Sequence, residues 1–571
     1  MPWSSRPSRI LKQNSSPPPD SNHKRRQKMA RMNTQFAVLL AAITLLFSDG
    51  PLLAQQPAAL LLGEGKPWQT PVYVNDSGVD GPTVVITGGL HGNEPAGARA
   101  AEQIRHWPIV RGTLIVIPRV NTAGLTADTR YIPEAPEVQK DLNRNFPYTG
   151  IADEPRGEIA TALWNLVVKQ DPDWLFDLHE GYEFNISHQP PPGKKKSVGS
   201  TIIYDQTQNI DPLTEKMLAA ANHLVSDPGR KFNLLKRGPV KTSLAAAAIN
   251  VLSKKAMIVE TTHQRQRLPV RTRQHRAMMS AALRQLGMIS ADCADVLTPP
   301  ADKRQGHTFV ALYDDEGGSD RGVNSLTHVF DGASDMTVAH LDADDLRPNV
   351  LSQFDVVVFG GGSGSKEAAT IGKPGAAAVK QFVNEGGGYI GVCAGAFLCS
   401  AHYSWSLNLI DTHVLTGKRE VPGQGLKSMW YRGKSSSQKM QLTKEGQQLF
   451  PNIAENVAVR YQNGPIVSPK QSPDLKPYTV LAWFRSEKVL HPPQKGTMID
   501  TPAIVRGEFG KGRVISISPH PESTDGLESM LAMAVRAVTD ASTPQPASQR
   551  TPATGKDAHP KLPPAVTPEP R

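Results

Sequence analysis

Short apolar runs alternate with longer amphipathic stretches over residues 65–290. Five runs of Val, Ile, Leu and Phe have the length and composition of buried strands, and three stretches between them repeat apolar residues with the period of a helix. This alternation predicts an α/β domain with a largely parallel sheet. The predicted strands are 83–87, 113–118, 174–179, 201–204 and 256–261, and the predicted helices are 95–107, 157–169 and 212–226.

A second alternation of the same kind covers residues 308–540 and predicts a second α/β domain. Its predicted strands are 309–313, 356–359, 389–392 and 513–518. The charged segment 291–307, which contains two adjacent prolines, is interpreted as a linker. Residues 541–571 contain eight prolines and almost no large apolar side chains. Such a segment cannot bury enough surface to offset its ordering entropy, so we expect a disordered tail.

The first 54 residues have the order of an export signal. A basic run, Lys24–Arg31, precedes an apolar run, Phe36–Phe47, and a small residue, Ala54, follows. This order is typical of a secretory signal, and the apolar run is shorter than the roughly 20 residues of a spanning helix. Residues 1–54 are therefore predicted to be a leader and signal peptide, and the protein is expected in the periplasm or outside the cell. The alternative is an uncleaved signal that anchors the chain in the membrane.

Composition excludes several classes of protein. The net charge is +10, but residues 1–54 alone carry eight Lys and Arg against two Asp. The remaining surplus is small, so no nucleic-acid partner is predicted. Three cysteines without a Cys-x-x-Cys pair exclude a disulfide scaffold and a zinc finger.

Candidate metal ligands follow two of the predicted strands. His91 and Glu94 lie in a glycine turn between the strand 83–87 and a helix opened by proline, and His179 ends the strand 174–179. Open α/β sheets place ligands at the carboxyl ends of their strands, so these side chains can converge. Two imidazoles and one carboxylate with an open fourth position make a catalytic zinc set. A strand-end histidine taken alone is more often an ordinary core or surface residue.

Polar residues further along the chain predict a substrate with a free carboxylate. Arg130, Asn143 and Arg144 offer guanidinium and amide groups, and guanidinium binds carboxylates with paired hydrogen bonds. Glu260 ends the strand 256–261 and can act as a general base on water activated by a metal. The lysine-containing loop 189–199 also favours an acidic substrate. The alternative for all of these charges is a solvated surface.

Five motifs in this order, GGLHGNEPAG, TRYI, DLNRNF, DLHEG and MIVETT, resemble the succinylglutamate desuccinylase and aspartoacylase branch of the zinc carboxypeptidase superfamily. The resemblance covers residues 65–290. It implies a mixed sheet with flanking helices and hydrolysis of an amide bond in an N-acyl amino acid or peptide by zinc-activated water. The sequence does not reveal the tyrosine that members of this family place over the substrate, or the small β-domain that is typical of aspartoacylases. The implied roles are one zinc held by His91, Glu94 and His179, substrate contacts from Arg130, Asn143 and Arg144, carbonyl polarisation by Arg144, and proton transfer by Glu260.

The second domain carries a different set of reactive residues. Cys393 stands at the end of the strand 389–392, between Gly391 and Gly395, in the pattern of a nucleophile elbow. A helix that starts after Cys393 would stabilise its thiolate. His520 and Glu522 follow the strand 513–518. The alternatives for Cys393 are a small buried packing residue or a disulfide with Cys399.

These residues over 308–540 resemble the class I glutamine amidotransferase-like fold, in particular the biotin-protein-ligase N-terminal-like group. The resemblance implies a flavodoxin-like domain in which Cys393, His520 and Glu522 are catalytic. The glycine loop 360–364 could supply amides that bind an oxyanion.

The sequence as a whole predicts an exported zinc hydrolase with two α/β domains. Its partner is predicted to be a small molecule or peptide with a free carboxylate, and the membrane is involved only through an uncleaved signal. Two other hypotheses stay open. The chain could be a binding protein that does not turn its ligand over, or a Cys393-dependent amidase in which the zinc domain selects the substrate.

Overall fold

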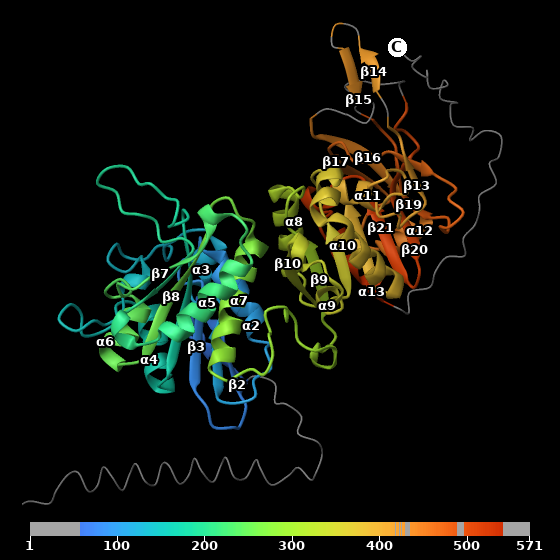
Figure 1. Cartoon of the computed structure of the whole chain (residues 1–571). Coiled ribbons are helices and arrows are strands. Elements are labelled where there is room, and N and C mark those ends of the chain that lie inside the picture. Colours follow the sequence, from blue (N-terminus) through green and yellow to red (C-terminus); the bar gives the residue numbers. More distant parts are fainter. Residues whose placement is uncertain are drawn as a thin grey trace, which may run out of the picture. The chain divides into compact units, whose positions relative to one another are not determined.

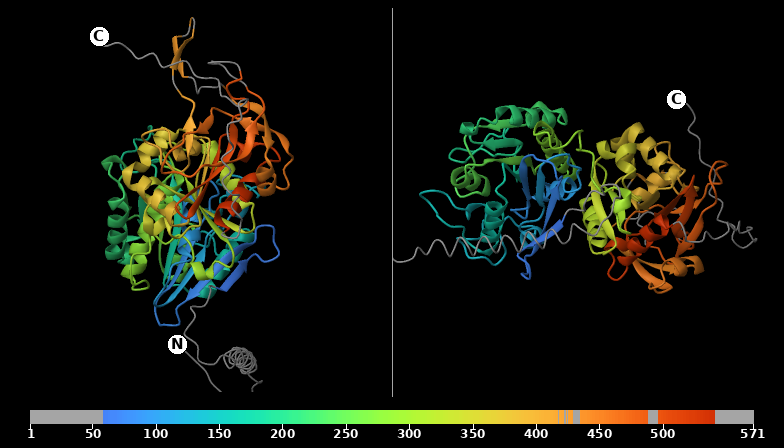
Figure 2. Two further views of the ribbon diagram at one scale, coloured as in Figure 1. Left: turned by 90° about the vertical axis from the view of Figure 1, so that its right-hand side faces the viewer. Right: turned by 90° about the horizontal axis from the view of Figure 1, so that it is seen from below.

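The computed structural model describes residues 58–540 except 417, 422, 424, 429–433 and 488–495. The predicted leader, 1–54, and the predicted tail, 541–571, lie outside the described residues. None of the helices in the described part combines the length and apolar character that a membrane span requires. The described chain forms two large mixed sheets with helices on both faces of each, which confirms the predicted α/β fold class (Figures 1 and 2).

The first sheet has eight strands in the order β1-β2-β4-β3-β5-β8-β6-β7. Its central strands β4, β3, β5 and β8 are parallel, and antiparallel pairs on both sides make the sheet mixed. All five predicted strands are confirmed, as β3, β4, β5, β6 and β8. The strands are β1 (Ala58–Leu62), β2 (Thr70–Asp76), β3 (Thr83–Gly88), β4 (Thr113–Ile117), β5 (Trp174–Gly181), β6 (Thr201–Tyr204), β7 (Asn233–Leu235) and β8 (Lys255–Thr262).

Helices cover both faces of the first sheet (Figure 1). Alternate side chains of β3 point to opposite faces, so Val84 and Ile86 join one core cluster and Val85 joins the other. The first cluster includes side chains of α2, α5 and α7, and the second includes side chains of α4 and α6. The helices are α2 (Pro95–Ile104), α3 (Thr122–Thr126), α4 (Glu158–Gln170), α5 (Asp211–His223), α6 (Leu244–Leu252) and α7 (Leu268–Gln285).

The second sheet has nine strands in the order β10-β9-β11-β12-β21-β20-β19-β16-β17. Its first five strands are parallel, and in chain order they run 2-1-3-4-5, which is the flavodoxin-like arrangement. The other strands add an antiparallel half that the sequence did not predict. The strands are β9 (Thr308–Tyr313), β10 (Met336–Leu341), β11 (Val356–Phe359), β12 (Gly388–Val392), β16 (Ser436–Leu442), β17 (Asn456–Tyr461), β19 (Thr479–Phe484), β20 (Pro502–Phe509) and β21 (Gly512–Ile517).

The parallel half of the second sheet also lies between two helical layers. Side chains of α8 and α13 pack in one core cluster, and those of α9, α10 and α11 pack in another. Two small antiparallel pairs, β13 with β18 and β14 with β15, complete the domain. The helices are α8 (Asp320–Asp331), α9 (Pro348–Leu351), α10 (Gly364–Glu385), α11 (Ala394–Cys399), α12 (Lys444–Leu449) and α13 (Ser529–Thr539), and the small strands are β13 (Thr412–Val414), β14 (Lys418–Val421), β15 (Gly425–Ser428) and β18 (Val467–Pro469).

Candidate active sites

The first candidate site lies at the carboxyl ends of β3 and β5. His91 follows β3 after a glycine turn, Glu94 directly precedes α2, and His179 lies near the end of β5. All three side chains are buried, and one donor atom from each lies within 4.8 Å of the others. The two histidine Nδ1 atoms are 3.1 Å apart, and the Glu94 carboxylate has an oxygen 2.8 Å from each. The three motifs therefore converge on one point.

Glycines allow this convergence. A Cβ at Gly92 would lie 1.9 Å from the carbonyl carbon of Gly124, so the turn that carries His91 has no room for a side chain there. A Cβ at Gly97 would lie 2.5 Å from the carbonyl oxygen of Leu178. The missing side chain lets α2 pack closely on β5, and this brings the first residue before the helix, Glu94, next to His179.

Two carboxylates orient the histidine rings from behind. Asp141 Oδ1 lies 3.2 Å from His91 Nε2, and Asp177 Oδ2 lies 2.8 Å from His179 Nε2. Asp177 is itself held by Thr87, whose hydroxyl donates to Oδ1 at 2.7 Å. A carboxylate at Nε2 places the ring hydrogen there and leaves Nδ1 free to bind a metal. Both Nδ1 atoms face the Glu94 carboxylate, which is the arrangement expected of metal ligands.

The charges around this point also suit a cation. Burial alone would lower the pKa of His179, but Asp177 and Glu94 outweigh it and raise that pKa well above its usual value. Burial alone would raise the pKa of Glu94, but His91 and His179 hold it well below its usual value. The same negative field would stabilise a divalent cation between these side chains. Two imidazoles and one carboxylate are a set of ligands that fits zinc.

Glu260 lies next to this group on β8. It is paired with His179 in the register of β5 and β8, so the two residues are direct neighbours on adjacent strands. The side chain is buried, and its Oε2 has no hydrogen-bond partner among the described residues. Burial raises the pKa of Glu260 to about 8. A carboxyl group with a pKa near neutrality is suited to proton transfer.

The three predicted substrate residues occupy different surroundings. Arg130 donates to Glu94 Oε1 at 3.0 Å and to Asp141 Oδ2 at 3.2 Å. The Asn143 amide is buried and lies within 3.2 Å of Asp177 Oδ2, while its oxygen accepts from a backbone N–H. Arg144 donates to the Asn143 carbonyl at 2.6 Å, and its other N–H groups have no partner among the described residues. Arg130 and Asn143 therefore support the histidine and carboxylate group, and Arg144 keeps donors for a ligand.

Sequence reasoning missed Asp141 and Asp177 as site residues, although both stand inside quoted motifs. Asp177 is fully buried and lies two residues before His179 on the same strand. Residues two apart on a strand share a face, so a carboxylate at that spacing was a usable signal. Asp141 had no such signal, because its contacts with His91 and Arg130 depend on how a loop folds back.

The second candidate site surrounds Cys393, between β12 and α11. Cys393 has φ of +51° and ψ of −94°, a backbone conformation that L-residues rarely adopt. A Cβ at Gly391 would lie 2.3 Å from the Gly395 oxygen, so the tight turn requires glycine there. The Cys393 N–H donates to the Ile517 carbonyl at 2.8 Å, and its thiol donates to the Gln462 carbonyl at 3.5 Å. This geometry matches the predicted nucleophile elbow.

His520 and Glu522 complete a buried group with Cys393. His520 Nδ1 lies 2.7 Å from Glu522 Oε1, and both side chains are buried. Burial alone would lower the pKa of His520, but Cys393 and Glu522 raise it to about 10. Gly361 of the glycine loop lies beside this histidine, since a Cβ there would be 3.0 Å from His520 Cε1. The structure therefore brings the predicted cysteine, histidine, glutamate and glycine loop together.

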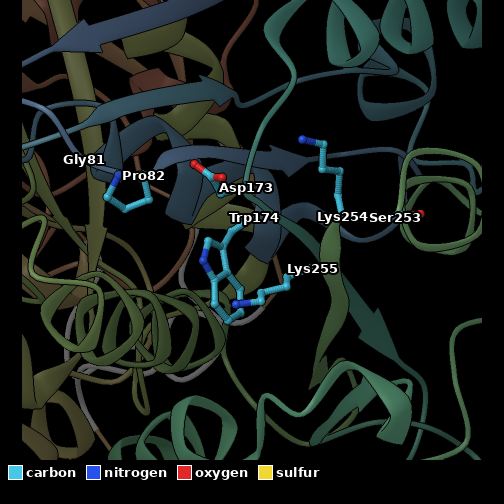
Figure 3. A pocket seen from close by; sticks show the side chains of 7 residues that line it. All are labelled: Gly81, Pro82, Asp173, Trp174, Ser253, Lys254 and Lys255. Atoms are coloured by element: carbon cyan, nitrogen blue, oxygen red, sulfur yellow. The ribbon is translucent and has the colours of Figure 1, made fainter.

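Cys393 and Cys399 are both free thiols, and each lies against a different backbone carbonyl. The chain also has a cavity of about 490 Å³, and Figure 3 shows the residues that line it. It is lined by the starts of β5 and β8 and by the residues before β3, so it is at the opposite end of these strands from His91 and His179. Its Lys254 pairs with Asp171 and its Lys255 lies over the Trp174 ring, so its charges are already partnered.

Comparisons with known families confirm both resemblances. Residues 80–186 match the succinylglutamate desuccinylase/aspartoacylase catalytic domain, and residues 309–546 match the N-terminal domain of biotin-protein ligase. A curated relative is N-alpha-acetyl-L-2,4-diaminobutyric acid deacetylase of Halomonas elongata, 32% identical over 117 residues. The match covers 19% of this chain and 32% of that protein. The chain thus spans about a third of the length of its curated relative.

Two solved structures are less similar in sequence to this chain than the curated deacetylase is. Cell shape determinant protein Csd4 of Helicobacter pylori is 21% identical over 38% of this chain and 55% of its own, with a TM-score of 0.32. The succinylglutamate desuccinylase/aspartoacylase of Rhodobacter sphaeroides is 19% identical over 43% of this chain and 70% of its own, with a TM-score of 0.29.

Proposed function

We propose that the first domain is a zinc-dependent hydrolase that cleaves an amide bond of an N-acyl amino acid or peptide. The observation that carries the proposal is the convergence of His91, Glu94 and His179 beside the unpartnered carboxyl group of Glu260. The matched family and the name of the curated deacetylase support the same class of reaction. We further propose that the protein works outside the cytoplasm, on the basis of the signal predicted in residues 1–54.

Each side chain has a distinct task in this reaction. When bound, zinc lowers the pKa of a water molecule and polarises the amide carbonyl. His91, Glu94 and His179 would hold the metal, and Asp141 and Asp177 fix the two histidine rings. A nearby dication favours the ionised form of a carboxyl group, so Glu260 can take the proton of the attacking water at Oε2. Glu260 then returns this proton to the leaving amine.

Arg144 is assigned to the substrate. Its guanidinium contacts the Asn143 carbonyl and keeps further donors, so it can pair with a carboxylate or stabilise the oxygen of the attacked amide. Arg130 is held by Glu94 and Asp141 and would have to share its donors to bind substrate. We therefore propose a substrate with a free carboxylate that is held mainly by Arg144.

Metal analysis tests the proposal directly. The chain is reconstituted with zinc and measured by elemental analysis beside a His179→Ala variant and a Cys393→Ala control. We expect about one zinc per chain in the parent and the control, and none in His179→Ala. N-acyl amino acids and short peptides are then screened for hydrolysis. No bound metal after reconstitution overturns the proposal, and tight binding of these compounds without turnover identifies a binding protein instead.

The second domain supports a second candidate function, a thiol-dependent amidase. The observation that favours it is the strained Cys393 beside the buried His520–Glu522 pair. The Cys393 thiolate would attack an amide carbonyl and form a thioester, and His520 would give a proton to the departing amine. Water would then hydrolyse the thioester and regenerate the thiol. Amide hydrolysis that survives a metal chelator and is lost in Cys393→Ala supports this function, and its absence for every amide tested contradicts it.

A further inference from the structure

A hydroxyl-rich groove of about 450 Å³ lies on the second domain. It forms where β16 and β17 pair, with Ser437 opposite Arg460, and where the chain continues after His520. Apart from one guanidinium and one carboxylate, its lining consists of Ser and Thr. The lining residues are Ser435, Ser436, Ser437, Arg460, Ser523, Thr524 and Asp525.

Arg460 is the half-buried cation of this groove. Its Nη1 donates to the Ser523 hydroxyl at 3.1 Å and its Nη2 donates to the Gln462 side-chain oxygen at 2.6 Å, and both partners are neutral. It forms no ion pair with a carboxylate of the described chain. Burial and the neighbouring Arg321 lower the pKa of Arg460, and the opposing effects of Glu522 and Cys393 do not fully offset them. Asp525, in contrast, is exposed.

The groove adjoins the thiol site through two shared contacts. The Arg460 carbonyl accepts from the His520 N–H at 2.8 Å. Gln462, which contacts the Arg460 guanidinium with its side chain, accepts from the Cys393 thiol with its backbone carbonyl at 3.5 Å. A ligand group in the groove would therefore lie close to an amide attacked by Cys393.

We propose that this groove binds a carboxylate of the substrate on which Cys393 acts, with Arg460 as the residue that selects it. The proposal rests on the thiol-dependent amidase proposed above. A guanidinium offers paired, planar donors that match a carboxylate, and the surrounding hydroxyl groups can donate to its remaining lone pairs. The substrate class is thus an amide or peptide that carries an anionic group next to the cleaved bond.

Two thiol reagents with the same reactive ring test this selection. N-ethylmaleimide is neutral, and 3-maleimidopropionic acid carries a carboxylate on a short arm. Rates of Cys393 labelling in the full chain are measured by mass spectrometry, with Cys393→Ser as background for the buried Cys293 and Cys399. N-acetylcysteine amide, a neutral thiol, gives the reference ratio of the two rates. We expect the ratio at Cys393 to favour the anionic reagent about fivefold over the reference, as for a pair of opposite charges near a protein surface, and to fall with salt.

Variants locate the effect. Arg460→Gln should return the ratio to the reference value, and Arg460→Lys should retain part of the preference because it keeps the charge. Lys169→Gln removes the same charge from an exposed position of α4 and should change nothing. Rapid labelling of Cys393 without a preference for the anionic reagent overturns the groove proposal, and so does a preference that survives in Arg460→Gln. In both cases the proposed thiol-dependent function stands. If Cys393 reacts no faster than the free thiol with either reagent, the amidase proposal fails and the groove proposal fails with it.

Discussion

The two candidate sites occupy equivalent places in their sheets but are built differently. Both lie beyond the carboxyl ends of parallel strands, His91 and His179 after β3 and in β5, and Cys393 and His520 after β12 and β21. The first site collects side chains from distant motifs, and buried carboxylates behind them hold their positions. The second depends on one residue in a strained turn, with Gly391 and Gly395 two residues away on either side. The first site should therefore respond to side-chain changes at several positions, and the second to changes in the backbone at one.

The largest effect is expected from Glu260→Gln. The substitution keeps the size of the side chain and all three metal ligands but removes the group that carries the proton. We expect zinc content to be unchanged and amide hydrolysis to fall about 10²–10⁴-fold, the usual contribution of general acid–base catalysis. Elemental analysis and steady-state rates measure the two effects. Glu367→Gln, a buried Glu→Gln change in the other domain, should leave this hydrolysis intact, and full activity in Glu260→Gln would remove Glu260 from the mechanism.

Asp177→Asn tests whether the outer carboxylates matter. Asp177 Oδ2 lies 2.8 Å from His179 Nε2, so it fixes the ring and increases its basicity as a ligand. Loss of such a partner usually weakens metal binding about 10–100-fold. Competition with a chromogenic chelator measures this change. The half-buried Asp141, which lies 3.2 Å from His91 Nε2, should give a smaller loss when it is replaced by Asn. Unchanged affinity in both variants would show that the ligands alone define the site.

Glu260 and Glu367 allow a direct comparison of the two domains, because burial raises the pKa of each of these carboxyl groups to about 8. Glu260 lies beside the proposed metal ligands, whereas Glu367 lies fully buried in α10, and neither of its carboxylate oxygens has a hydrogen-bond partner in the part of the chain that the structure describes. Only Glu260 lies beside groups for which a carboxyl group with such a pKa could transfer a proton. Glu367 is expected to affect stability alone.

Glu367→Gln should therefore change the pH dependence of unfolding. Above pH 4.5 the unfolded chain releases the Glu367 proton, while the folded chain keeps it up to about pH 8. The free energy of unfolding then falls by about 1.4 kcal/mol per pH unit over this range. Gln does not titrate. The free energy of unfolding of the variant, measured with urea, should therefore rise relative to that of the parent between pH 5 and pH 8. The exposed Glu385→Gln, at the far end of α10, is the control, and an equal slope in parent and Glu367→Gln would show that Glu367 is not buried as a neutral acid.

The sequence predicted the parallel strands well, with β10 as the exception, because buried parallel strands consist of continuous apolar runs. β5 and β8, for example, begin and end within two residues of their predicted bounds. In the antiparallel half of the second sheet, β16 was missed because it is buried on one side only. In β16, Gln438, Met440 and Leu442 are buried while Ser437 and Lys439 are exposed. Such a strand has few apolar residues and no continuous run.

The reactive residues were predictable because each stands at a strand end, where backbone register determines position. Their supporting contacts were not. The hydrogen bonds of Arg130 with Glu94 and Asp141 arise from a loop that returns to the sheet, and no periodic pattern encodes that path. The groove around Arg460 was missed for the same reason, since it joins a strand to a segment more than 60 residues later.

The smallest effect is expected at Cys393 itself. A non-glycine residue at φ of +51° stores strain of about 1–3 kcal/mol, which Gly would relieve. Cys393→Gly should therefore raise the free energy of unfolding of the second domain by about 1 kcal/mol relative to Cys393→Ala, which also lacks the thiol but keeps the Cβ. Chemical unfolding measures both variants. Because both lack the sulfur atom, the difference between their free energies of unfolding reports the backbone strain alone. Equal stability of the two variants would mean that the turn is relaxed with a side chain present, and the contrast between a site held by side chains and a site held by a strained backbone would no longer stand.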